Sequence, residues 1–112
     1  REVFSVERIG ALLEQARVRL LRELRLRNVR MRLAVGREGL PEAAPFDAIV
    51  IAAAASTPPP ALVEQLAPGG RMILPLGAQK QRLCLIERSA AGVIDNMLEE
   101  VHFVPLRAGT LR

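Results

Sequence analysis

Residues Pro45–Ala55 read PFDAIVIAAAA, and residues Leu66–Gly77 read LAPGGRMILPLG. The two apolar runs are separated by a segment long enough for one short helix. A strand, a crossover helix and a second strand form the unit from which parallel α/β sheets are built. We therefore predict an α/β fold with parallel strands at Phe46–Ala53 and Arg71–Leu76.

Turn residues set the expected bounds of the connecting helix. A run of prolines after the first strand cannot continue it, because proline has no amide donor. Ser56 or Thr57 can then cap a helix that contains Leu62 and Leu66. Pro68–Gly70 is a helix stop placed directly before the next strand.

The amino-terminal part repeats the same unit. Glu2–Glu7 alternates as a strand does, Arg8–Leu24 carries apolar residues at helical spacing, and Val29–Val35 reads as a second strand. Glycines and a proline then form a loop. Arg1 already lies inside this pattern, so we expect further residues upstream.

After Gly77 the pattern changes to strands with no helix between them. Gln81–Glu87 and Leu98–Val104 are both strand-like, and Ser89–Gly92 reads as a turn region. Strands joined without a crossover pair antiparallel, so we predict an antiparallel pair at the edge of the sheet. Cys84 fits an ordinary buried or half-buried position in the first of these strands.

The composition limits the class of protein. The chain has 112 residues, half of them apolar, and a formal net charge of +4. One globular domain at most is expected, and it should be cytoplasmic with no membrane partner, because no apolar run approaches roughly 20 residues. One cysteine and one histidine are too few for an internal disulfide or a zinc site. Few aromatic residues argue against a nucleic-acid partner, since bases stack on them, and leave nucleic-acid binding as a weak alternative.

Five motifs are distributed along the chain: VFSVER at Val3–Arg8, PFDAIV at Pro45–Val50, LVEQLAPGGR at Leu62–Arg71, LPLG at Leu74–Gly77 and VHFVPL at Val101–Leu106. Together they resemble the protein-L-isoaspartate O-methyltransferases, and the resemblance covers essentially the entire chain. The last motif is distinctive for this family among methyltransferases of the Rossmann-like fold.

The resemblance implies a fold and a reaction. The fold is a partial Rossmann-like methyltransferase sheet, with parallel strands, crossover helices and a carboxyl-terminal antiparallel edge pair. Residues 1–112 would form part of one S-adenosylmethionine-dependent domain that methylates the carboxylate of isoaspartyl residues in damaged proteins. In the family's sheet the last strand is inserted between the fifth and the sixth. The central first strand and the glycine-rich cofactor loop would lie upstream of Arg1.

The resemblance also assigns site residues. Glu7, which closes a strand, would accept hydrogen bonds from both ribose hydroxyls of the cofactor. Without the resemblance, a carboxylate favoured by the dipole at a helix amino terminus fits Glu7 equally well, and the resemblance favours the ribose role. Val104, Pro105 and Leu106 would border the peptide substrate, and a packing role at a sheet edge fits their apolar character as well. The residues implied for cofactor binding are Glu7, Arg8, Val35, Gly36, Ala52 and Ala53. No catalytic side chain and no metal ligand is implied.

The chain departs from the family pattern at two cofactor positions. Ala34-Val35-Gly36 stands where the family usually has Gly-Asp-Gly, and a valine side chain cannot accept a hydrogen bond from adenine. Ala52-Ala53-Ala54 stands in place of Thr-Ala-Ala and lacks its hydroxyl. We therefore expect the isolated chain to be weakly active or inactive, with a non-catalytic binding or dimerisation module as the alternative. The strands that flank the missing one would either pair directly or form a homodimer through their exposed edges.

Overall fold

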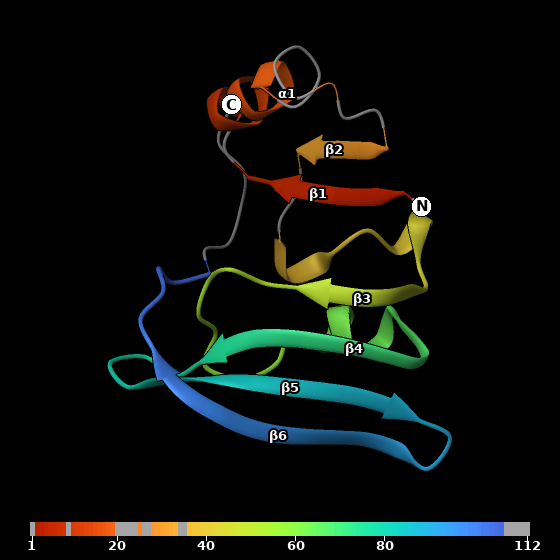
Figure 1. The fold of residues 1–112 in the computed structure, drawn as a ribbon, viewed down its shortest axis with the longest axis vertical. Helices are drawn as coiled ribbons and strands as arrows, with labels where there is room; N and C mark the ends of the chain where they lie inside the picture. Colours follow the sequence, from red (N-terminus) through yellow and green to blue (C-terminus); the bar gives the residue numbers. More distant parts are fainter. Residues whose placement is uncertain (1, 9, 20–24, 26–27, 34–35, 107–112) are drawn as a thin grey trace. The chain divides into compact units, whose positions relative to one another are not determined.

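A computed structural model describes the chain in the residue ranges 2–8, 10–19, 25, 28–33 and 36–106. These residues fall into two compact units, one up to Gly39 and one spanning Leu40–Leu106. The first has a two-stranded sheet and the second a four-stranded sheet (Figure 1). The strand at Val3–Glu7 belongs to the first sheet and the strand at Phe46–Val50 to the second.

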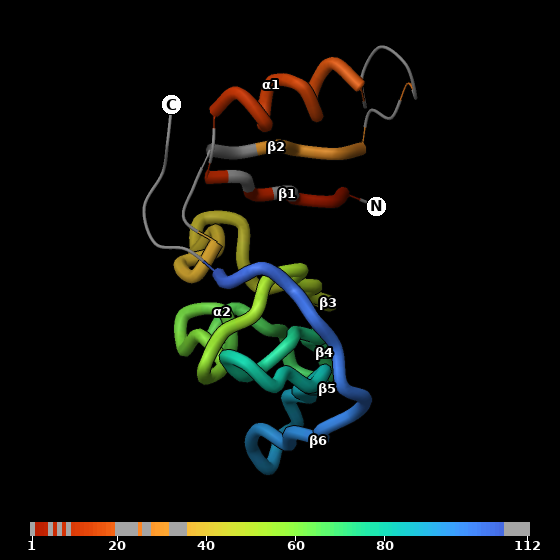
Figure 2. The backbone as a smooth tube through the Cα atoms, turned by 90° about the vertical axis from the view of Figure 1, so that its left-hand side faces the viewer, coloured from red at the N-terminus to blue at the C-terminus, as the bar shows by residue number. Residues whose placement is uncertain are grey.

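The first unit has the predicted order of strand, helix and strand. β1 (Val3–Glu7) and β2 (Val29–Leu33) pair in parallel along their whole length. α1 (Gly10–Val18) lies between them in the chain and runs alongside β2, where it buries Leu13 (Figure 2). The predicted helix and strand residues that lie outside the described ranges are 9, 20–24 and 34–35.

The second unit holds a mixed sheet in the order β3-β4-β5-β6. Its elements are a 3₁₀ turn at Pro41–Ala43, β3 (Phe46–Val50), α2 (Pro60–Glu64), β4 (Leu66–Leu76), β5 (Gln81–Ser89) and β6 (Gly92–Val101). β3 and β4 are parallel, as predicted, and β4, β5 and β6 follow one another antiparallel. This is the predicted α/β class, with parallel strands joined by a helix and an antiparallel edge.

The bounds around α2 differ from the prediction. β3 ends at Val50 and not at Ala53. α2 has five residues, and Pro59 occupies its cap position without any side-chain hydrogen bond, so the predicted caps at Ser56 or Thr57 were wrong. Pro60 is the first residue of α2. It has no backbone N–H that needs a cap, and its ring fixes φ at a value that a helix requires.

Pro68–Gly70 does not stop the helix but lies inside β4. The register runs from Phe46 opposite Leu66 to Ala48 opposite Arg71, so β4 carries extra residues at this point and forms a bulge. A Cβ on Gly70 would lie 2.8 Å from the Ala67 carbonyl oxygen and 2.9 Å from that of Phe46. Glycine is therefore required at position 70 because two backbone oxygens approach it closely.

The antiparallel hairpins after β4 confirm the prediction for the carboxyl-terminal part, but β6 begins at Gly92 and ends at Val101. The strand order also differs from the one that the family resemblance implied. The last strand, β6, lies at the outer edge, and β5 lies beside β4 (Figure 1). The links Gly77–Lys80 and Ala90–Ala91 are too short to carry the chain past a neighbouring strand, so consecutive strands pair.

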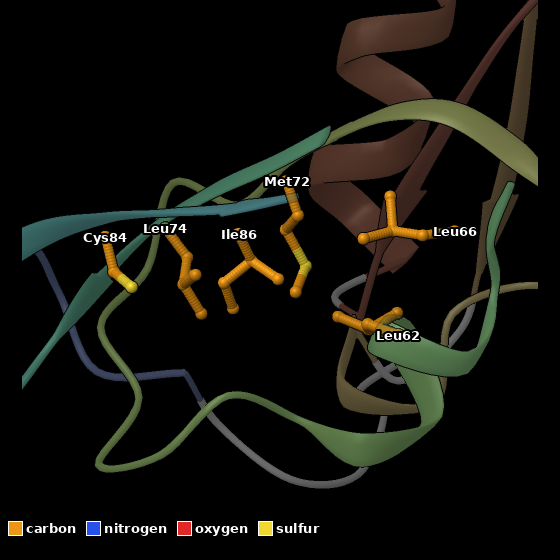
Figure 3. Close-up of a cluster of buried hydrophobic side chains, with 6 residues drawn as sticks. All are labelled: Leu62, Leu66, Met72, Leu74, Cys84 and Ile86. Atoms are coloured by element: carbon orange, nitrogen blue, oxygen red, sulfur yellow. The ribbon is translucent and has the colours of Figure 1, made fainter. Parts of the chain in front are cut away.

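The core of the second unit lies between its sheet and α2. Met72 pairs with Ile86 and Leu74 pairs with Cys84 across β4 and β5, so these four side chains share one face of the sheet. Figure 3 shows them pointing to the same side, where Leu62 of α2 also lies. The buried cluster consists of Leu62, Leu66, Met72, Leu74, Cys84 and Ile86. This cluster fixes the carboxyl ends of β3 and β4, where the candidate site begins.

Candidate functional site

In the first unit the candidate residues lie at the carboxyl ends of the two strands. Glu7 is the last residue of β1 and stands opposite Leu33, the last residue of β2, so both strands end at the same level. Arg8 follows directly and is half-buried, and Gly36 opens a 3₁₀ turn shortly after β2. Ligands of open α/β sheets bind outside the carboxyl ends of the strands, which is where Glu7, Arg8 and Gly36 lie. Val35 is outside the described residues.

In the second unit the chain after β3 stays extended and bonds to the end of β4. The Ile51 N–H donates to the Ile73 carbonyl at 3.0 Å, and the Ala55 N–H donates to the Pro75 carbonyl at 3.1 Å. The Gly77 N–H in turn donates to the Ala55 carbonyl at 2.8 Å. Ala52 and Ala53 are thereby held at the carboxyl end of the parallel pair.

The same segment bonds on its other side to the carboxyl-terminal part of the chain. The Ala54 N–H donates to the Val104 carbonyl at 2.7 Å, and the Leu106 N–H donates to the Ala54 carbonyl at 2.8 Å, so that Ala54 and Pro105 form a parallel bridge. Figure 2 shows the blue end of the described chain beside the yellow-green segment that follows β3. The structure therefore brings the predicted substrate residues next to Ala52 and Ala53.

The side chains of this arrangement differ in exposure. Ala52, Val104 and Pro105 are exposed, and Val104 keeps 69% of its surface accessible. Ala53 and Leu106 are half-buried. Small or apolar groups therefore line an accessible stretch in which the two predicted sets of residues lie side by side.

Comparisons with known proteins decide the family. The family model for protein-L-isoaspartate(D-aspartate) O-methyltransferase matches residues 1–110. The chain belongs to this family. It is 53% identical over 110 residues to the protein-L-isoaspartate O-methyltransferase of Dechloromonas aromatica, covering 98% of this chain and 50% of that protein. It is 58% identical over 109 residues to that of an Azoarcus species, covering 97% of this chain and 50% of that protein. The chain thus spans about half the length of the curated relatives it matches.

Solved structures support the same fold. A Plasmodium falciparum protein described as a protein-L-isoaspartate O-methyltransferase, in complex with S-adenosyl-L-homocysteine, matches with a TM-score of 0.81 and 29% identity. The match covers 95% of this chain and 52% of that one. A second protein-L-isoaspartate O-methyltransferase structure matches with a TM-score of 0.85 and 27% identity, over 96% of this chain and 34% of the other. The described sheets therefore form part of the methyltransferase fold.

The structural role of one buried residue of this methyltransferase-family chain, Gln81, was not predicted from the sequence. Gln81 begins β5, and its side chain reaches the backbone of Phe103 and Ala78. Sequence reasoning treated Gln81 only as the first residue of an alternating strand. The signal that was available is a glutamine at the start of an apolar strand directly after a glycine-containing link.

A second glutamine with a related role was also missed. Gln65 is buried, and its Oε1 accepts a hydrogen bond from the Leu40 N–H at 2.9 Å. Its backbone carbonyl accepts a hydrogen bond from the Phe46 N–H at 2.7 Å, which fixes the start of β3. The backbone of Gln65 therefore supports the strand that leads to Ala52, whereas its side chain holds Leu40.

The described residues contain no cluster of three or more side chains able to hold a metal ion. Burial, and then the negative charge of Asp95, raise the pKa of the Cys84 thiol above its usual range. Cys84 is therefore protonated at neutral pH and packs as a small apolar side chain. No helix in the described ranges is long and apolar enough to cross a membrane.

Proposed function

We propose that this chain is the part of a protein-L-isoaspartate O-methyltransferase that binds the cofactor ribose and borders the peptide substrate. The whole reaction would transfer a methyl group from S-adenosylmethionine to the carboxylate of an isoaspartyl residue. The observation that carries the proposal is the pairing of Ala54 with Val104 and Leu106, which puts the predicted substrate residues beside Ala52 and Ala53. Residues 1–112 would accordingly be part of one methyltransferase domain.

The residues present fit the cofactor at several points. Ala52 is exposed and small, and Gly36 has no side chain, so both leave room for a ligand at the carboxyl ends of their strands. Glu7 ends β1, and its carboxylate is the group that we propose accepts hydrogen bonds from the ribose hydroxyls. The Plasmodium falciparum relative was solved with the demethylated product, S-adenosyl-L-homocysteine, which supports this choice of cofactor. When bound, S-adenosylmethionine supplies an electrophilic methyl group on a sulfonium.

The task of the protein in this reaction is positioning. S-adenosylmethionine would supply its methyl group to a carboxylate oxygen of the substrate, with the electron pair of the broken carbon–sulfur bond left on sulfur. The carboxylate is already ionised at neutral pH, so no general base is required. The reaction is accelerated by holding the carboxylate and the methyl group in line and by excluding water. The apolar residues Val104–Leu106 are suited to excluding water beside the reacting groups.

Family membership favours this reaction over the alternative of a non-catalytic module. Val35 still lacks the acceptor that the family pattern provides for adenine, so weak activity of the isolated chain stays a prediction. A cytoplasmic location, the absence of nucleic-acid and membrane partners, and a homodimer through the edges of β1 and β3 also stay predictions.

Peptide binding tests the proposed substrate. A labelled isoaspartyl peptide should bind more tightly than the aspartyl peptide of the same sequence in fluorescence anisotropy. Val104→Asp should weaken binding of the isoaspartyl peptide about fivefold or more, because a carboxylate near the substrate carboxylate repels it by about 1 kcal/mol or more.

Val93→Asp is the matched control, since Val93 is also an exposed valine but lies on β6. The affinity of the Val93→Asp variant for the isoaspartyl peptide should stay within about twofold of that of the unmodified chain, which corresponds to roughly 0.4 kcal/mol. Equal binding of the isoaspartyl and aspartyl peptides would contradict the proposed substrate. Equal weakening by both substitutions would exclude Val104 from the substrate site.

A further inference from the structure

The carboxyl-terminal segment changes partner at Phe103. The ladder between β5 and β6 ends where Gln81 stands opposite Val101. Three residues later, Val104 and Leu106 bond to Ala54 and no longer to β5. A chain that leaves one strand for another must satisfy the backbone groups of the residues in between.

The side chain of Gln81 forms hydrogen bonds with the backbone groups of Phe103. Its Oε1 accepts a hydrogen bond from the Phe103 N–H at 2.7 Å, and its Nε2 donates to the Phe103 carbonyl at 3.1 Å. Nε2 also donates to the Ala78 carbonyl at 3.1 Å. Only 7% of the Gln81 surface is exposed. The amide thus acts as an additional peptide group that extends the ladder from Val101 to Phe103.

We infer that Gln81 is a positioning residue, whose amide sets the path of Phe103 so that Val104 and Leu106 pair with Ala54. A buried amide with both its acceptor and its donors engaged is costly to replace, because its loss removes three part-buried hydrogen bonds to the backbone of Phe103 and Ala78. The substrate role of this placement rests on the proposed function. The placement itself rests on the hydrogen bonds alone.

Amide hydrogen exchange, measured by NMR on the 112-residue chain, tests the placement. Gln81→Leu should raise the exchange rates of the Ala54 and Leu106 amides about tenfold or more, the effect of losing one buried hydrogen bond. The Gly77 amide bonds to Ala55 on the opposite side of the same segment, and its rate should change less than about threefold, or roughly 0.7 kcal/mol. Unchanged exchange at Ala54 and Leu106 would overturn the inference.

Gln65→Leu provides the matched control. Gln65 is buried to the same degree, at 6% exposure, and also accepts a hydrogen bond from a backbone N–H, that of Leu40. This variant should speed exchange at Leu40 and leave Leu106 unchanged. If both variants accelerate Leu106 equally, Gln81 contributes only general stability and the inference is wrong.

Two milder variants decide the question if Gln81→Leu does not fold. Gln81→Glu keeps an acceptor of the same length for the Phe103 N–H but loses the Nε2 donor, and Gln81→Asn keeps both groups one methylene too short. Exchange at Leu106 should rise in both, and more than at Gly77. Equal exchange rates at Leu106 in the unmodified chain and in both variants would refute the positioning role.

Peptide binding then separates positioning from stability. In the Gln81 variants that fold, affinity for the isoaspartyl peptide should be at least fivefold lower than in the Gln65→Leu variant. Their affinity for S-adenosyl-L-homocysteine should stay unchanged. Faster exchange at Leu106 with unaltered peptide affinity would overturn the substrate role of Gln81. If the unmodified chain binds no isoaspartyl peptide, the proposed function fails, and the exchange data alone decide the placement.

Discussion

Replacing Gly77 with alanine should lower the free energy of unfolding of the Leu40–Leu106 unit by about 3 kcal/mol or more. Gly77 has a φ of +123°, in a region that residues with a side chain rarely adopt. A Cβ at this position would also overlap the Lys80 carbonyl oxygen. The strand end can move little to relieve this overlap, because the Gly77 N–H bonds to Ala55.

Gly92→Ala is the control for this prediction. Gly92 has a similar φ of +127°, but a Cβ there meets no atom within 4 Å. Its substitution should cost only the backbone strain, about 1–2 kcal/mol. The chain lacks tryptophan and tyrosine, so urea unfolding is best followed by far-ultraviolet circular dichroism. Equal destabilisation by the two substitutions would show that the contact with Lys80 is unimportant.

Leu74→Ala should have an effect of similar size, lowering the free energy of unfolding by about 2–5 kcal/mol. The Leu74 side chain is completely buried between β4, β5 and α2, so its removal leaves a cavity in addition to the lost transfer energy. A core in a unit of fewer than roughly 70–80 residues rarely supplies more than about 3–5 kcal/mol. Much of this unit should therefore be unfolded at 25 °C in the variant.

Leu98→Ala removes the same atoms from an exposed position on β6, where 39% of the leucine surface is accessible. It should change the unfolding midpoint by an amount equivalent to less than about 1 kcal/mol. A Leu74 variant as stable as the Leu98 variant would mean that the cluster around Leu74 is not the core of the unit.

The order of the elements could be predicted from local patterns, because apolar alternation and helical spacing are properties of short segments. The bounds near α2 could not. Pro68–Gly70 has the composition of a helix stop, yet it forms a bulge in β4, because pairing with β3 and the close approach at Gly70 determine its conformation. Contacts between distant residues overrode the local preference there.

The candidate site was predicted only as two separate sets of residues. The hydrogen bonds that join Ala54 to Val104 and Leu106 connect segments about half the chain apart, and no local pattern indicates them. Gln65 and Gln81 were missed for the same reason. Their side chains bond to backbone groups 25 and 22 residues away, and a backbone N–H or carbonyl leaves no signature in the sequence.

Cofactor binding is the most direct test of the proposed ribose site at Glu7. S-adenosyl-L-homocysteine is titrated by calorimetry into the folded chain, into Glu7→Gln and into Glu2→Gln. Glu2 is the control, because it is an exposed glutamate just before β1 that forms an ion pair with Arg30. We expect micromolar binding that Glu2→Gln leaves unchanged and Glu7→Gln weakens about tenfold or more, the value of a hydrogen bond to a charged group. No binding to the folded chain, or equal affinities for the two variants, would contradict the proposed ribose site.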